Sequence, residues 1–357
     1  MGLSMYDYYT SQPEYMKSIL ENREAYLGAF APFCFNTNPD RLYLCGSGTS
    51  FHACAASQAY MQAILGVETT AIAPSRLGEL NGERPLVIAV SQGGRSTNTV
   101  AAIENLSRRG IPVATLTYST DTPVARAGGC MLTLGVGDET AGPKTRGYTG
   151  TVLSLYLMAL AAGLAMKTLD ENAHARRLQA IAEVVSHARA NQQACKVFYD
   201  RHFSTLQKAN SFMFAGKGVS AQVAGEMALK EQETLCYPAS GYEFEEYLHG
   251  PGCCTDSGTA LFLMPAGDMD DERMRRLATI VGAATENVYF ISYSGPSFGE
   301  RDLRLQNPDP AFLAPFSTIF FAQLLSALMP EATGRGRHPA VKNIFAMMDT
   351  KVPLDKA

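Results

Sequence analysis

Apolar residues along this chain gather in short runs that do not alternate with polar ones. The runs LYLC (42–45), LVIAV (86–90), FMFA (212–215) and ALFLM (260–264) are each followed by a turn and then by a segment with helical spacing of its apolar positions. Continuous apolar strands separated by helices are typical of a parallel sheet that is covered on both faces. The pattern therefore predicts an α/β fold built from Rossmann-like halves.

One part of the sequence aligns with a later part of the same chain. The segment LYLCGSGTS at 42–50 aligns with FMFAGKGVS at 212–220, and both combine a strand-like run, two glycines one residue apart and a serine two residues after the second. Two further pairs of segments match in the same order: 86–94 with 260–268, and 112–119 with 287–294. Three matched elements at a nearly constant offset predict a duplicated unit.

The repeat divides the chain into five segments. We expect an N-terminal helix, a first α/β half, a helical connector, a second α/β half and an extended C-terminal arm, with bounds 1–30, 31–168, 169–209, 210–333 and 334–357. Residues 147–166 carry no charge and reach the ~20 residues that could span a bilayer. Because this stretch contains three glycines and sits inside the repeating soluble pattern, we expect a buried interdomain or interface helix.

Composition narrows the classes of function. The net charge of −4 is spread along 357 residues without a basic block, which argues against a nucleic-acid partner and against a polybasic membrane patch. The eight cysteines form no CxxC pair, and the first residues lack the basic and apolar regions of a signal peptide. These features predict a cytoplasmic protein.

The turn after the run at 86–90 is the first candidate site. Small residues at a strand-to-helix turn let backbone N–H groups point at an anion beside the positive end of a helix, and hydroxyl groups add donors. The residues of this turn that would do so are Ser91, Gln92, Gly93 and Ser96. The corresponding turn of the second copy reads PAGD at 265–268, without the hydroxyl groups. The first copy is therefore the candidate for binding phosphate.

A second hydroxyl-rich turn in the same copy strengthens this interpretation over that of an ordinary glycine turn with a capping serine. Its residues are Ser47, Gly48, Thr49 and Ser50. The chain contains no GxxxxGK[ST] motif, and the GxG at 46–48 lacks the spacing of dinucleotide-binding folds. These turns favour a small phosphorylated ligand over a nucleotide.

The second copy carries the candidate proton-transfer groups. Glu226, Lys230 and Glu233 lie at i, i+4 and i+7, which places them on one face of a helix. A solvated salt-bridge face has the same spacing and remains the alternative. A long loop follows and reaches His249 just before Gly-Pro, and loops of that length are often functional. A histidine and a carboxylate are the usual proton-transfer pair near neutral pH.

The motifs SGTSFH, AVSQGGRSTNT, ALKEQE and EEYLHGP together resemble the double sugar-isomerase (SIS) domain family, which includes the isomerase half of glucosamine-6-phosphate synthase. The resemblance implies two tandem SIS domains, each a flavodoxin-like parallel sheet sandwiched by helices. It also implies that the sugar phosphate is surrounded by Ser50, Ser91, Gln92, Gly93 and Ser96.

The same resemblance assigns the catalytic roles. Glu233 would be the base that moves a proton between C1 and C2 of the open-chain sugar, and Lys230 would steer hydroxyl groups or that carboxylate. His249 would assist ring opening or protonate the leaving group, and would reach the site from the neighbouring subunit of a homodimer. The chemistry needs a base, an acid and a phosphate anchor, but no metal or other cofactor.

The chain also departs from the synthase. Met1 is not followed by the cysteine nucleophile of a glutaminase domain, so we do not expect glutamine-dependent synthesis. The lysine of the synthase's C-terminal arm aligns with Ala346, which leaves Lys351 as the candidate substitute. The loop at 142–146 reads GPKTR, and Lys144 or Arg146 could meet the carboxylate of an amino-acid leaving group.

This pattern is similar to that of the deglycases acting on 6-phosphorylated fructosamine-type (Amadori) sugars. There, a carboxylate base shifts the ketosamine to a C1 imine, which water hydrolyses to an aldose 6-phosphate and an amine or amino acid. A ketose-aldose isomerase or an aminosugar-phosphate deaminase would use Glu233 identically. A phosphosugar sensor without catalysis is a further alternative, opposed by the presence of both Glu233 and His249 and by the absence of a DNA-binding module in the first 30 residues.

Overall fold

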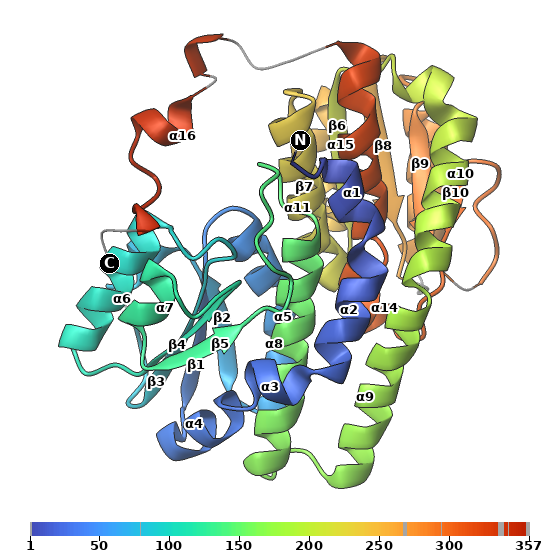
Figure 1. Cartoon of the computed structure of the whole chain (residues 1–357). Coiled ribbons are helices and arrows are strands. Elements are labelled where there is room, and N and C mark those ends of the chain that lie inside the picture. Colours follow the sequence, from blue (N-terminus) through green and yellow to red (C-terminus); the bar gives the residue numbers. More distant parts are fainter. Residues whose placement is uncertain are drawn as a thin grey trace. The chain divides into compact units, whose positions relative to one another are not determined.

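The computed structural model describes residues 2–78, 80–266, 270–293, 295–334, 339–341 and 343–354. The chain divides into two compact units, each containing one five-stranded sheet (Figure 1). The first unit comprises Met1–Leu3, Glu14–Ala182 and His338–Ala357, and the second comprises Ser4–Pro13 and Glu183–Arg337.

The first unit holds a parallel sheet with the strand order β2-β1-β3-β4-β5. Its strands are β1 (Arg41–Cys45), β2 (Glu68–Ile72), β3 (Pro85–Val90), β4 (Val113–Thr117) and β5 (Cys130–Thr133). The helices that follow the strands or flank the sheet are α3 (Arg23–Leu27), α4 (Phe30–Thr37), α5 (Thr49–Leu65), α6 (Thr97–Arg108), α7 (Pro123–Ala127) and α8 (Arg146–Ala165).

The second unit repeats this topology. Its sheet has the order β7-β6-β8-β9-β10 when read in the same sense, again with all strands parallel. Its strands are β6 (Ser211–Gly216), β7 (Ala239–Glu243), β8 (Thr259–Met264), β9 (Val288–Ser292) and β10 (Asp302–Arg304). Its helices include α1 (Met5–Thr10), α10 (Ala188–Leu206), α11 (Val219–Thr234), α12 (Phe244–Leu248), α13 (Asp270–Val281), α14 (Pro310–Leu313) and α15 (Ile319–Thr333).

The turns that begin the two halves have the same backbone conformation. Gly48 has φ 56° and ψ −130°, and Gly218 has φ 54° and ψ −125°; each precedes the first long helix of its half. Only glycine adopts this left-handed region readily. The prediction of two tandem flavodoxin-like halves with parallel sheets is confirmed, and the matched sequence segments occupy equivalent places in them.

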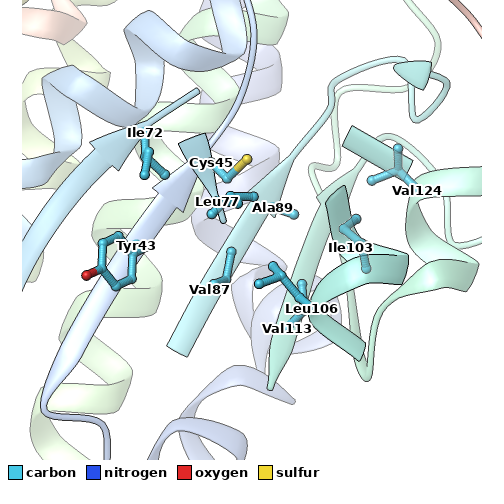
Figure 2. Close-up of a cluster of buried hydrophobic side chains, with 10 residues drawn as sticks. All are labelled: Tyr43, Cys45, Ile72, Leu77, Val87, Ala89, Ile103, Leu106, Val113 and Val124. Atoms are coloured by element: carbon cyan, nitrogen blue, oxygen red, sulfur yellow. The ribbon is translucent and has the colours of Figure 1, made fainter. Parts of the chain in front are cut away.

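The core of the first unit explains its apolar runs. Figure 2 shows one face of the sheet, where buried side chains of alternate strand residues pack together with side chains of α6 and α7. The labelled strand residues of this cluster include Tyr43, Cys45, Val87, Ala89 and Val113. The intervening residues Leu42, Leu44, Leu86 and Ile88 are buried as well. Because successive side chains point to opposite faces, burial of both sets means that both faces are covered.

The uncharged segment that could have spanned a bilayer is part of the core. It forms α8, which packs against α3, α4 and α5, and Tyr156 of α8 stacks on Tyr60 of α5 with ring centroids 3.9 Å apart. Among the described residues one other stretch, Pro310–Thr333, has comparable length and hydropathy. In both stretches, 83% of the most apolar 18 residues are buried inside the protein. The protein interior accounts for this hydrophobicity, which confirms that the segment is a buried helix. The cytoplasmic location stays a prediction.

The N-terminal segment and the connector are each divided into more helices than their patterns indicated. The N-terminal segment contains α1, α2 (Gln12–Glu21) and α3 in place of one helix, and α2 restarts with Pro13 in its first turn, where proline is tolerated. The connector forms α9 (Glu171–Ser186) and α10, separated at His187. The C-terminal arm is less extended than expected, since its described residues form short helical turns at Pro339–Val341 and in α16 (Ile344–Met347), followed by a strand-like contact at Lys351.

Candidate functional site

The two hydroxyl-rich turns lie at the point where the first sheet changes direction. The chain leaves β1 toward β2 on one side and leaves β3 toward β4 on the other, although β1 and β3 are neighbours. In open parallel sheets, ligands bind beyond the carboxyl ends of the strands at such a switch point. The turns at 46–50 and 91–96 follow β1 and β3 directly, so topology brings together both halves of the predicted phosphate site.

Two glycines of these turns are required by steric limits on the backbone. A Cβ on Gly46 would lie 2.7 Å from the backbone of Ser50, and Gly94 has φ 62° with a Cβ position 2.4 Å from Thr122. Neither position accepts a larger residue without a shift of the chain. Gly93 differs, because a Cβ there would meet nothing within 4 Å. Its backbone therefore faces open space where a ligand could approach.

Four polar residues of the turns are buried. Thr49, Ser50, Ser91 and Gln92 are each 7% exposed. The Gln92 amide donates to the Thr151 hydroxyl at 3.2 Å, and that hydroxyl donates to the Gly147 carbonyl at 2.6 Å. Gln92 is thus held in place by α8, a helix that lies outside the sequence motifs that predicted the site.

Asn98 joins the two turns and was not predicted. It accepts a hydrogen bond from the Ser96 hydroxyl at 2.6 Å and donates from Nδ2 to the Ser47 hydroxyl at 3.1 Å. Asn98 lies in the first turn of α6, inside the motif SQGGRSTNT. Its residue type gives no signal of this role, which depends on the distance between the turns.

The basic residues at the start of α8 and in the loop before it contact nearby protein groups. The Lys144 ammonium donates to the Glu139 carbonyl, and to the Ala141 carbonyl at 3.4 Å. The Arg146 guanidinium lies 4.1 Å from the centre of the Tyr15 ring and donates to the Asp138 carbonyl at 3.2 Å. In this structure Lys144 stabilises its own loop, and its contact with a substrate stays a prediction.

A buried carboxylate, Glu139, caps the start of α8. It accepts hydrogen bonds from the Thr145 N–H at 2.7 Å, the Thr145 hydroxyl at 2.6 Å and the Gly147 N–H at 3.0 Å. Backbone donors at a helix N-terminus favour a negative charge, and here the protein itself supplies it. The N-terminus of α8 is therefore already occupied by a carboxylate, whereas the N-termini of α5 and α6 adjoin the two hydroxyl-rich turns.

In the second unit, α11 buries the predicted catalytic face. The Glu226 and Lys230 side chains are fully buried, and the Lys230 ammonium lies 3.4 Å from Glu226 Oε1 and 2.5 Å from Glu233 Oε2. The Glu233 side chain is 25% exposed. The alternative of a solvated salt-bridge face is therefore wrong, because its central cation and one of its acids have no solvent exposure.

The surroundings of Lys230 fix its charge. Burial by itself lowers the pKa of the Lys230 ammonium, but the neighbouring Glu226 and Glu233 carboxylates outweigh burial and raise the pKa above its ordinary value. Lys230 therefore stays protonated at neutral pH and cannot accept a proton. It can hold the Glu233 carboxylate in place, which leaves Glu233 as the group of this set able to act as a base toward solvent-accessible atoms.

His249 ends α12 and is exposed. Its ring nitrogen Nδ1 is paired with the Glu245 carbonyl at 2.8 Å. The N-cap of this helix is Glu243, whose carboxylate accepts from the Glu245 N–H at 2.6 Å and the Glu246 N–H at 3.3 Å. The contacts that orient the His249 ring come from its own helix rather than from Glu233, and the ring is presented to the outside of the chain.

Glu231 is a third acid of α11, one that the sequence pattern did not single out. It is fully buried, and burial raises its pKa well above the ordinary value, although the Ser326 hydroxyl and the Lys230 ammonium both act in the opposite direction. A carboxyl group with such a pKa is protonated in the folded protein over a range in which it would be ionised in the unfolded chain.

Glu231→Gln is expected to stabilise the protein at pH 8 by about 1–3 kcal/mol, because the wild-type carboxyl group is ionised in the unfolded chain at this pH and must take up a proton on folding, whereas glutamine need not. The unfolded chain ionises Glu231 above pH 4.5, so the stability present below that pH is lost as pH rises toward the folded pKa. The unfolding temperatures of variant and wild type should therefore converge at pH 5. A difference that is the same at pH 5 and pH 8 would contradict a titrating Glu231.

One family model and several curated relatives match this chain. The SIS domain family model matches residues 37–161. A glutamine–fructose-6-phosphate aminotransferase (isomerizing) from Caldanaerobacter subterraneus subsp. tengcongensis is 24% identical over 306 residues, which are 83% of this chain and 49% of the relative. The chain spans about half the length of the curated relatives it matches.

Solved structures resemble the whole chain. A structure from Clostridium difficile 630, described provisionally as a phosphosugar isomerase, is 25% identical, with a TM-score of 0.88 over 98% of this chain and 99% of that one. The C-terminal domain of glucosamine-fructose-6-phosphate aminotransferase from Francisella tularensis is 17% identical, with a TM-score of 0.82 over 93% and 97%. The segment matched by the family model contains the predicted phosphate turns, whereas Lys230, Glu233 and His249 lie outside it.

Proposed function

We propose that the protein, whose residues 37–161 match the SIS domain family, processes a phosphorylated sugar by proton transfer between C1 and C2. The turns after β1 and β3 would hold the phosphate, and Glu233 would be the base. The observation that carries this proposal is the buried Glu226–Lys230–Glu233 set, in which only Glu233 has an exposed fraction. Burying an ammonium and a carboxylate is costly, and a protein that only bound sugars would gain nothing evident from it.

The proton transfer follows from the charges of this set. A carboxylate accepts the proton from the carbon beside the sugar carbonyl, and returns it to the neighbouring carbon in a 1,2-shift. Lys230 remains an ammonium throughout and fixes one oxygen of Glu233, so the other oxygen is the one that meets substrate. His249 would assist ring opening or protonate the leaving group, and we propose that it serves the neighbouring subunit of a homodimer.

We infer that the reaction is the hydrolysis of a 6-phosphorylated fructosamine-type sugar to an aldose 6-phosphate and an amine or amino acid. Lys144, in the loop before α8, is the basic residue that would meet a carboxylate-bearing leaving group, since Arg146 is 5% exposed and lies against the Tyr15 ring. The second candidate is a ketose-aldose phosphosugar isomerase, which the similarity to the Clostridium difficile structure favours. A sensor without catalysis has the least support, since it leaves the buried set of α11 unexplained.

A substrate panel separates these reactions. The purified protein would be incubated with 6-phosphorylated Amadori adducts, fructose 6-phosphate and glucosamine 6-phosphate, and released amine, ammonia and aldose phosphate would be measured separately. Amine release from the adducts supports the deglycase, interconversion of hexose phosphates supports the isomerase, and ammonia release identifies a deaminase. Binding of these compounds with no turnover of any would overturn the enzymatic proposal.

Ser91→Ala combined with Ser96→Ala is expected to weaken binding of fructose 6-phosphate by about 10- to 100-fold, because hydrogen bonds to charged groups contribute roughly 1.5–3 kcal/mol. Binding of unphosphorylated fructose should be unchanged. Calorimetric titration with both sugars measures the difference. Ser186→Ala in α9, whose hydroxyl donates only to the Glu183 carbonyl of its own helix, is the matched control. An equal loss for both sugars would contradict the phosphate assignment.

A further inference from the structure

The C-terminal segment docks on the turn that follows β3. The Arg95 side chain donates from Nε to the Val352 carbonyl at 2.9 Å, and the Val352 N–H donates to the Arg95 carbonyl at 2.8 Å. The Thr97 N–H donates to the Thr350 carbonyl at 3.2 Å, and the Thr97 hydroxyl donates to the Asp349 carbonyl at 2.8 Å. Figure 1 shows this end of the chain beside α6. The arm is therefore attached to the proposed phosphate turn itself.

These bonds define the register of the contact. Ser96 and Lys351 are opposite one another in an antiparallel bridge. The hydrogen bonds join the residues on either side of them, so the two form a non-hydrogen-bonded pair. In such a pair the Cα atoms are about 4.5 Å apart and the side chains leave the same face at close range. Lys351 therefore extends from the face that carries the Ser96 hydroxyl.

That face belongs to the predicted phosphate site. The Ser96 hydroxyl is bonded to Asn98, and Asn98 is bonded to the Ser47 hydroxyl of the neighbouring turn. The Lys351 side chain thus starts beside the Ser96 hydroxyl, which Asn98 links to the Ser47 hydroxyl of the other turn. Its side chain is exposed, and no salt bridge to any described residue engages it.

The two turns supply little positive charge to balance a bound phosphate. The residues at 46–50 and 91–99 contain a single cationic side chain, Arg95, whose Nε is taken by the Val352 carbonyl. The remaining polar side chains are hydroxyls and amides. A phosphate monoester carries close to two negative charges at neutral pH, and charge-assisted hydrogen bonds to it are roughly twice as strong as neutral ones.

We propose that Lys351 is a cationic ligand of the sugar phosphate, so that the C-terminal segment completes a site whose other side chains come from the turns after β1 and β3. The proposal rests on the proposed function, since it takes the phosphate site as given. A lysine ammonium suits this role because it is a compact charge with three donors on a flexible stem. The role is electrostatic and requires no covalent step.

Calorimetric titration with inorganic phosphate, fructose 6-phosphate and fructose tests this inference. Lys351→Ala is expected to weaken binding of both phosphate ligands by about 10- to 100-fold, the loss of roughly 1.5–3 kcal/mol. It should leave fructose binding unchanged and reduce the salt dependence of fructose 6-phosphate binding. Lys351→Arg keeps the charge and should bind close to wild type. Lys17→Ala, which removes an exposed lysine paired with Glu21 in the same unit, is the matched control.

The outcomes separate this inference from the proposed function. If wild type binds fructose 6-phosphate and Lys351→Ala binds it equally well, the role of Lys351 is overturned and the function stands. If wild type binds no phosphorylated sugar, the proposed function fails first. A Lys351→Arg variant as weak as Lys351→Ala would also overturn the electrostatic role. Ending the chain after Met348 removes the docked segment and should weaken fructose 6-phosphate binding at least as much as Lys351→Ala, with an unchanged unfolding temperature showing that the fold is intact.

Discussion

Glu233→Gln should lower turnover of the sugar substrate by about 100- to 10,000-fold, the usual contribution of a general base. Glutamine has the shape of glutamate and can still accept from the Lys230 ammonium, which lies 2.5 Å from Glu233 Oε2. It cannot take a proton from carbon. Affinity for the phosphorylated substrate should change little, because the phosphate is assigned to other residues. Steady-state kinetics and calorimetric titration of the same preparation measure the two quantities.

The controls for this experiment address both the residue and the subunit arrangement. Glu246→Gln changes an exposed glutamate of α12 and should leave turnover unchanged. If His249 serves the neighbouring subunit, mixing Glu233→Gln with His249→Ala under exchange conditions should restore part of the activity, since some heterodimers then hold one complete site. Turnover by Glu233→Gln near the wild-type rate would show that Glu233 is not the base.

The sheets were predictable because burial on both faces leaves a direct mark on sequence. Strands such as β3 read as unbroken apolar runs, and the turn glycines at 48 and 218 repeat because only glycine adopts their backbone conformation readily. The edge strands were less visible. In β7, for example, only Ala239 is buried, so the segment ASGYE carries no hydrophobic signal.

The site was predictable in part, for a related reason. The hydroxyl-rich turns stand out locally, and topology alone brings them together between β1 and β3. Asn98 and Glu139 were missed because each acts across a distance set by the fold: one between two turns, the other from a loop onto the start of α8. The docking of Lys351 beside Ser96 joins residues 255 positions apart (351 − 96), which no local pattern indicates.

The burial of Lys230 could not be decided from its spacing. An i, i+4, i+7 pattern of Glu, Lys and Glu is the same on an exposed helix as on a buried one. What decides the matter is packing, since α11 lies against β6, β7 and α15. This packing removes solvent from Glu226 and Lys230 and leaves Glu233 at the margin, and that difference in exposure separates a structural pair from a reactive group.

Lys230→Met should destabilise the second unit by about 3–5 kcal/mol, because it leaves the fully buried Glu226 carboxylate without its cation. For a unit of this size that corresponds to a fall in unfolding temperature of roughly 10 °C. The pKa of Lys230 is raised in the folded protein, so its stabilising contribution is complete below the ordinary value of 10.5 and is lost only as pH rises through the folded pKa. The difference between variant and wild type should therefore not shrink between pH 7 and pH 9.

The partner substitution shows whether the loss comes from an uncompensated charge. Glu226→Gln in the Lys230→Met background removes the buried carboxylate and should recover most of the lost stability, whereas adding Glu246→Gln to Lys230→Met should recover none. A packing defect at Lys230 would behave differently, because the cavity or clash would persist whatever the charge at Glu226. If the double variant is as unstable as Lys230→Met alone, the buried ion pair is not what holds this face of α11 together, and the argument that Lys230 positions Glu233 through its charge loses its basis.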